Sequence, residues 1–171
     1  MAGLRSVAEH LSTHAKGLGP GDAEADAFGR SAFNRHYYAT FLTVRELLVA
    51  IDIAWAKTPH AEIPERIEKN LVARIKDTAK RQVRSGALGA GRSSAIVGQS
   101  ISAATEIASV LKSAYTIRVA ADYEPSHKIV FGAAGIELDS CSIGEASSWY
   151  VRVEREKWKL IAISKELGLV S

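Results

Sequence analysis

The chain has 171 residues, of which 47% are apolar and 24% are charged, the proportions of an ordinary globular protein. A chain of this length fits one domain, so we expect a single helical domain over residues 1–171. A net charge of +3 is too small by itself to indicate nucleic-acid binding, and four prolines with few clusters of β-branched residues argue against an all-β fold.

The location of the protein can also be predicted from the sequence. Cys141 is the only cysteine and cannot form an internal disulfide, which indicates a reducing compartment. Residues 1–10 lack the unbroken apolar segment of a signal peptide. No window approaches the roughly 18 apolar residues that a membrane-spanning helix needs. We therefore expect a soluble, cytoplasmic protein.

Apolar residues recur at steps of three and four along most of the chain, which predicts helices. The expected helices cover about residues 3–16, 23–56, 63–83, 94–123 and 144–167. Asp22 can cap the second helix, and Pro64 stands in the first turn of the third, where its missing N–H costs nothing. No strand pair is convincing, and we expect residues 127–143 to form one last helical turn or a docked loop. The prediction is an all-α, up-and-down bundle of four to five helices.

The second helix carries polar residues within a face that is expected to be buried. Its apolar side chains recur at steps of four and three: Phe33, Tyr37, Phe41, Val44 and Leu48. Arg30, Asn34, Arg35 and His36 interrupt this run. An unpaired buried donor or charge costs about 1–3 kcal/mol or more, so these residues need partners. The helix therefore holds either a polar network or a functional site.

Two other patterns are weaker. His10 and His14 stand four residues apart in the first helix, but no carboxylate or cysteine completes a metal site, and we expect two exposed histidines and no metal. The glycine-rich segment 85–94 matches a phosphate-loop pattern if Arg92 replaces the usual lysine. That motif needs a buried strand before it, and here a charged helix precedes it. We expect a flexible linker between two helices, and no cofactor.

Positive charge is concentrated in the third helix and the linker. Between residues 69 and 92 there are seven basic residues and one acid, Asp77; the basic residues are Lys69, Arg74, Lys76, Lys80, Arg81, Arg84 and Arg92. Two interpretations stay open for this run, a solvated helix face and a patch that binds a polyanion.

Two short motifs carry a resemblance to a known family. Asn34-Arg-His-Tyr-Tyr-Ala39 lies on an early helix, and Arg118-Val-Ala-Ala-Asp-Tyr123 closes a later one. Followed by a final amphipathic helix, these motifs resemble the HEPN superfamily, the higher eukaryote and prokaryote nucleotide-binding domain, over a core of about residues 23–165. The resemblance implies a bundle of four or five helices that dimerises. In active members it also implies metal-independent ribonuclease activity.

The signature of active members is an Arg, four to six residues, and then a His, which Arg30 and His36 match. A neutral His can take a proton from a ribose 2′-hydroxyl, and an Arg can hold the phosphate. On this resemblance Arg35 and His36 are the first catalytic candidates and Arg30 and Asn34 support them. The supporting side chains further out are Tyr38 and Asp122, with Asp122 orienting Arg35. The RNA backbone would be guided by Lys80, Arg81 and Arg84.

The residues also allow a purely structural interpretation. Arg30 and His36 are six positions apart, about 120° around an ideal helix, and would converge only across a bend or through a dimer. Asn34, Arg35 and Tyr38 could instead form a buried network with Asp122 that fixes two helices together.

Two functional hypotheses follow. One is a HEPN-like endoribonuclease, a toxin or phage-defence component, that cleaves RNA in a cleft where two subunits meet. The other is a non-catalytic helical adaptor that dimerises and binds a protein partner, such as a nucleotidyltransferase-type protein or an antitoxin.

Overall fold

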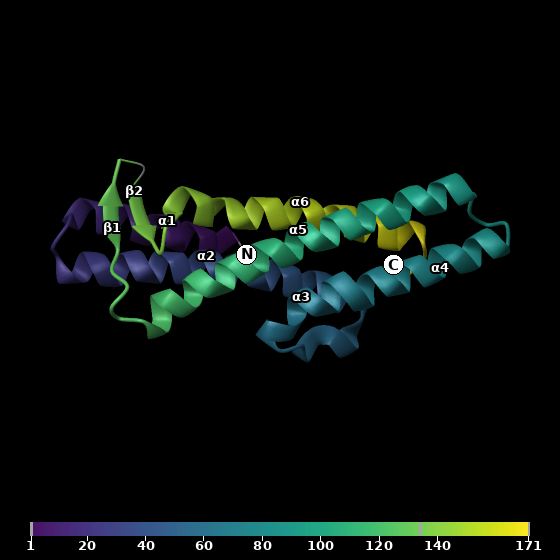
Figure 1. Ribbon diagram of the computed structural model, residues 1–171, viewed down its shortest axis with the longest axis horizontal. Helices are drawn as coiled ribbons and strands as arrows, with labels where there is room; N and C mark the ends of the chain where they lie inside the picture. The colour runs from purple at the N-terminus through teal and green to yellow at the C-terminus, as the bar shows by residue number, and fades with distance from the viewer. Residues whose placement is uncertain (1, 134, 171) are drawn as a thin grey trace. The chain divides into compact units, whose positions relative to one another are not determined.

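The computed structural model describes residues 2–133 and 135–170, and it confirms the prediction of an all-α, bundle-like fold (Figure 1). The α-helices are α1 (Ala2–Leu18), α2 (Ala23–Ile51), α3 (Ile63–Glu65), α4 (Val72–Arg84), α5 (Ala90–Tyr123) and α6 (Ile143–Glu166). Two 3₁₀ helices, η1 (Ile53–Lys57) and η2 (His60–Glu62), and a π-helix, η3 (Arg66–Leu71), lie between α2 and α4. The strands are β1 (Val130–Gly132), β2 (Gly135–Leu138) and β3 (Cys141–Ser142).

The contacts divide the chain into two compact units. The first unit comprises Met1–Thr43 and Leu111–Val151, and the second comprises Val44–Val110 and Arg152–Ser171. Helices α2, α5 and α6 each contribute one part to either unit. The single domain expected over residues 1–171 stays a prediction.

The observed helix boundaries differ from the predicted ones where a polar side chain accepts a hydrogen bond from the backbone and so starts a new segment. Asp22 caps α2 as expected, since its Oδ1 accepts from the N–H of Glu24 at 2.7 Å and of Ala25 at 3.2 Å. The helix ends at Ile51 instead of residue 56, because Asp52 is extended and its Oδ1 accepts from the N–H of Ala54, which starts η1. At the next helix, Pro64 lies in the first turn as predicted.

The prediction for residues 127–143 was wrong, because this segment forms a three-stranded antiparallel sheet in the order β1-β2-β3. Asp139 and Ser140 turn the chain between β2 and β3 with φ angles of 49° and 63°, the left-handed values that a two-residue hairpin turn requires. Ile136 and Leu138 alternate with the half-buried Glu137 and are fully buried. The segment therefore anchors in the core as a hairpin.

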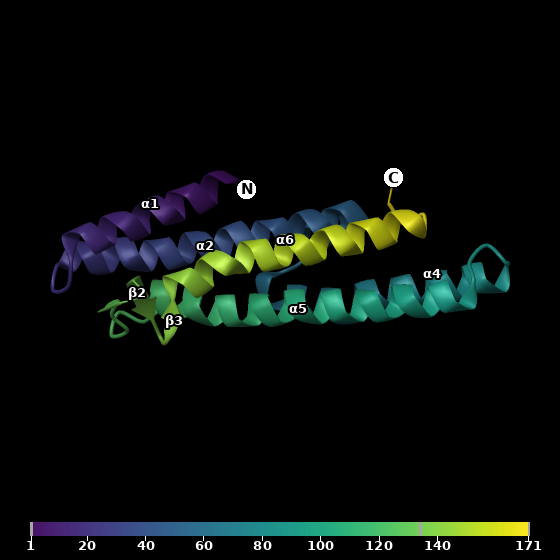
Figure 2. The ribbon, with the colours of Figure 1, turned by 90° about the horizontal axis from the view of Figure 1, so that it is seen from above.

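The core of the first unit contains aromatic residues of α2 and α6. Figure 2 shows α1 running beside the N-terminal half of α2. Tyr37 is 2% exposed. Its ring stacks on that of Phe41, with 5.8 Å between the ring centroids, and lies edge-on to that of Tyr115, with 6.2 Å between the centroids. On α6, Trp149 is buried. The N-terminal part of the apolar stripe predicted for α2, Phe33, Tyr37 and Phe41, is thus buried in this unit.

The core of the second unit is aliphatic. Aliphatic residues that recur at steps of four through η3 and α4 are fully buried: Ile67, Leu71, Ile75 and Ala79. Helix α4 and the N-terminal part of α5 are joined by residues 85–89 and form a helical hairpin, so the expected linker is confirmed and shorter than predicted. Leu47, Ile96 and Leu160 from α2, α5 and α6 complete this core.

Helix α5 corrects the expectation that no segment resembles a membrane span. Among the described helices it is long and apolar enough to cross a membrane by length and composition, with 34 residues and a mean hydropathy of 1.2 over its best window. Of that window, 44% is buried inside the protein. A core helix of a soluble protein has the same properties, and α5 contributes buried side chains such as Ile107 and Ile117.

Candidate functional site

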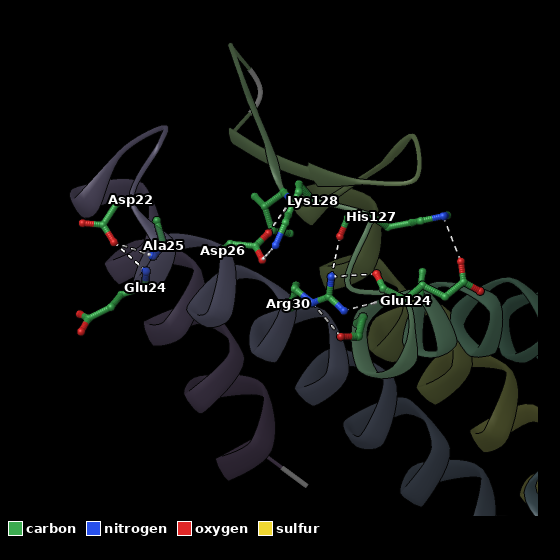
Figure 3. A network of polar contacts seen from close by, with 11 residues as sticks. Asp22, Glu24, Ala25, Asp26, Arg30, Glu124, His127 and Lys128 are labelled. Carbon is green, nitrogen blue, oxygen red and sulfur yellow. Dashed lines mark hydrogen bonds and ion pairs between the residues drawn. The ribbon is translucent and has the colours of Figure 1, made fainter.

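Arg30, on α2, donates four hydrogen bonds to the backbone at the end of α5 and in the loop that follows (Figure 3). Its Nε donates to the carbonyl oxygen of Ala121 at 2.9 Å, and its Nη2 donates to that of Ala120 at 3.1 Å. Its Nη1 donates to the carbonyl oxygens of Glu124 at 3.0 Å and His127 at 2.5 Å. The last carbonyl groups of a helix lack intrahelical donors, so this guanidinium caps α5.

The loop that follows α5 is held by a second set of polar contacts, of which Figure 3 shows those of Asp26 and that of His127 with Glu124. Asp26 of α2 accepts from the backbone N–H of Ile129 at 2.9 Å and pairs with Lys128 at 3.2 Å. The His127 ring lies between two carboxylates, with Nδ1 at 2.6 Å from Asp139 and Nε2 at 3.0 Å from Glu124. Arg30 therefore belongs to a network that fixes this loop.

Asn34 and Asp122 form a polar contact between α2 and α5, as the structural interpretation predicted, but Asp122 is exposed and Arg35 does not bond to it. The Asn34 side-chain amide donates to Oδ1 of Asp122 at 2.7 Å, and Oδ2 of Asp122 pairs with Arg118, four residues earlier, at 2.9 Å. Burial disfavours the charge of Arg118, but hydrogen bonds with Tyr123 and Tyr38 and the charge of Asp122 raise its pKa overall. Tyr38 is thus drawn into the same network.

Arg35 has a different environment. It is exposed, and among the described residues its guanidinium makes no hydrogen bond or ion pair. It lines a pocket of about 270 Å³ together with Arg30, Ser31, Asn34 and Asp122. The expectation that Asp122 orients Arg35 is not met, because the two oxygens of that carboxylate face Asn34 and Arg118.

His36 lies inside the first unit. Its side chain is 1% exposed, its Nδ1 has no hydrogen-bond partner within the described part of the chain, and it is absent from the lining of the pocket beside Arg35. Burial lowers its pKa to about 4; the charge of Glu9 on α1 opposes this shift and that of Arg5 adds to it. The imidazole is therefore neutral near pH 7, and it is separated from Arg30 around α2 as the helical spacing implied.

The residues predicted to guide RNA lie in the second unit, on α4. Arg81 donates to the hydroxyl of Thr78 at 3.0 Å. Lys80 and Arg84 line a groove that also involves α5. The catalytic candidates Arg30, Asn34, Arg35 and His36 belong to the first unit.

The two histidines of α1, His10 and His14, are exposed as predicted. Over residues 2–133 and 135–170, no group of three or more His, Cys, Asp or Glu side chains has an arrangement that could hold a metal ion. The interactions that sequence reasoning missed are those of Arg30 with backbone carbonyls. Their only sequence signal was an arginine on a helix that packs near the end of another.

Comparison of the chain with protein-family models, with curated proteins and with solved structures finds no match. The resemblance to the HEPN superfamily therefore depends on the two short motifs alone and stays a prediction.

Proposed function

We propose that this protein is a non-catalytic helical adaptor, which dimerises and binds a protein partner. The observation that carries the proposal is the hydrogen bonding of the Arg30 guanidinium. Its donors are directed at four backbone carbonyl oxygens, of Ala120, Ala121, Glu124 and His127. A guanidinium held in this way has little capacity left to bind a phosphate in a transition state.

The burial of His36 supports the same proposal. A general base must come within hydrogen-bond reach of the proton that it takes, directly or through one water. A side chain that is 1% exposed and lies outside the neighbouring pocket has no route to a ribose hydroxyl. Its lowered pKa also makes the imidazole a weak base near neutral pH.

The proposal includes a HEPN-like bundle, a cytoplasmic location and a partner of the kind encoded with such proteins, a nucleotidyltransferase-type protein or an antitoxin. The resemblance implies ribonuclease activity only for members with a working Arg and His pair. An adaptor function is compatible with the same motifs, because Asn34 and Asp122 then stabilise the packing of α2 on α5.

RNA cleavage is the second candidate function, and Arg35 favours it. This exposed arginine has no partner among the described residues and lines the pocket with Ser31 and Asn34, so it is available to hold a phosphate. Such an enzyme would depend on Arg35 and would need a proton acceptor other than His36.

The test is incubation of the purified protein with total RNA in EDTA, with a known metal-independent ribonuclease as positive control. We expect no cleavage by the wild type, by Arg35→Ala or by His36→Ala. Cleavage that is lost in Arg35→Ala or in a folded His36→Ala would overturn the adaptor proposal. Light scattering tests the dimer: we expect twice the 18.4 kDa mass of the chain, and a monomer would remove that part of the proposal.

A further inference from the structure

A groove of about 690 Å³ lies in the helical hairpin of the second unit, between α4 and the N-terminal part of α5. It is larger than the pocket of about 270 Å³ beside Arg35. Its lining residues on α5 run from Ala90 to Ile101, which corresponds to about 16 Å of helix, or three turns. A groove of this length matches a short helix of a partner better than it matches a small molecule.

The floor of the groove is aliphatic. Val83 of α4 and Val97 of α5 are half-buried, and Ile101 is 48% exposed. Gly98 lies between them on α5, and a Cβ added there would meet no atom within 4 Å. A partner that covers these exposed apolar side chains removes their surface from water, which contributes about 25 cal/mol of binding free energy for each Å² covered. The floor therefore favours an apolar occupant.

The rim of the groove is basic and unpaired. Lys76, Lys80 and Arg84 recur at steps of four along α4, so they stand in one row. None of the three makes a hydrogen bond or an ion pair with a described residue, and the described residues that line the groove include no Asp or Glu. The row is an uncompensated positive edge beside an apolar floor.

The other basic residues between positions 69 and 92 differ from this row, because each of them has a partner within the protein. Lys69 pairs with Glu65 at 2.8 Å and Arg74 with Asp52 at 2.9 Å. Arg81 donates to Thr78, and Arg92 forms two hydrogen bonds with Glu166. In the described residues, the cations of the run without an internal partner are the three that line the groove.

We propose that this groove binds an acidic amphipathic helix of a partner protein, with its apolar residues on the floor and its carboxylates along the row of Lys76, Lys80 and Arg84. This inference rests on the adaptor function proposed above and names its docking site. RNA fits less well, because the described lining residues include no aromatic side chain on which a base can stack. A peptide with leucines on one face and glutamates on the other matches both the floor and the rim.

The probe is a fluorescein-labelled helical peptide of about 14 residues, with leucines at steps of three and four and glutamates elsewhere. Fluorescence anisotropy measures its binding to the full chain. Two further probes are the same peptide with lysines in place of glutamates and a single-stranded RNA of similar length. We expect the acidic peptide to bind with a Kd in the micromolar range, and we expect binding of the lysine peptide at least ten-fold weaker.

Variants test the floor and the rim separately. Gly98→Trp fills the groove and should weaken binding ten-fold or more. Its control, Gln99→Trp, carries the same side chain at an exposed position of α5 outside the groove and should leave binding unchanged. Lys80→Glu should weaken binding several-fold. Its control is Lys57→Glu, an equal charge change at an exposed residue of η1 outside the groove. Circular dichroism confirms that each variant is folded.

Three outcomes would overturn the inference. Equal binding of the acidic and the lysine peptides would show that the basic rim does not favour an acidic partner over a basic one. Binding of RNA without binding of the peptide would make the groove a polyanion site. Conversion of a dimer to a monomer by Gly98→Trp would mean that a second copy of the chain covers the groove. Failure here is distinguishable from failure of the adaptor proposal, which RNA cleavage in EDTA would overturn.

Discussion

Nη1 of Arg30 donates to the carbonyl oxygen of His127 over 2.5 Å, a contact that joins residues 97 positions apart in the chain. Together with its bonds to the last turn of α5, this contact fixes α2, α5 and the loop before β1 in one arrangement.

Arg30→Ala should therefore destabilise the protein. Hydrogen bonds to charged groups contribute about 1.5–3 kcal/mol, and since water can reach part of this site we expect a loss of about 2–4 kcal/mol in the free energy of unfolding. Urea denaturation measures it. Arg35→Ala is the matched control, because this neighbouring arginine is exposed and makes no hydrogen bond or ion pair with a described residue, and it should change stability by less than about 0.5 kcal/mol. Equal effects would show that the cap contributes nothing.

Two glycines should respond to alanine in opposite directions. A Cβ at Gly29 would lie 2.8 Å from Cγ1 of Ile129, so Gly29→Ala should cost about 1–3 kcal/mol of stability through overpacking. A Cβ at Gly98 meets nothing within 4 Å inside α5, so Gly98→Ala should stabilise by about 0.5–1 kcal/mol through helix propensity. Thermal denaturation of both variants provides the measurement. A stabilising Gly29→Ala would mean that Ile129 does not pack on this helix.

The positions of the main helices were predictable because their signals are local. The stripe of Ile67, Leu71 and Ile75 and the cap at Asp22 depend on residues within a few positions of one another. The sheet was missed because its turn uses Asp139 and Ser140, which are less specific than an Asn-Gly pair, and because its strands have two to four residues.

The candidate site was harder to predict, because the environment of each of its side chains depends on contacts with residues distant in sequence. Arg30 and His36 matched the Arg and His signature, yet Arg30 is held by carbonyl groups about 90 residues away and His36 is buried. The bond between Asn34 and Asp122 agrees with one of the two interpretations that the motifs left open, the structural one. No local sequence pattern indicates which polar side chains of a helix are buried or bonded within the fold and which remain available for function.

Cys141 should be unreactive in the folded protein. It is 5% exposed, and burial together with the neighbouring Glu145 raises its thiol pKa to about 12, so the reactive thiolate is scarce at pH 8. We expect no labelling by iodoacetamide in buffer over an hour, and complete labelling in urea, as measured by intact mass. Rapid labelling in buffer would mean that the strand β3 opens readily.

The pH dependence of stability should report His36. Its pKa is about 4 in the folded protein, against 6.5 for a histidine in water. As the pH falls from 6.5 to 4, the unfolded chain takes up a proton that the folded chain does not, so this histidine removes stability on acidification. The full loss is on the order of 3 kcal/mol, and above pH 6.5 the effect is absent.

Urea denaturation of the wild type and of His36→Gln between pH 4 and pH 7 isolates this contribution, because other titrating groups affect both proteins. We expect the stability of the wild type to fall relative to the variant as the pH is lowered. An NMR titration should also show no protonation of the His36 ring down to about pH 5. Protonation near pH 6.5 would place this imidazole in water, and the ribonuclease hypothesis would then regain its general base.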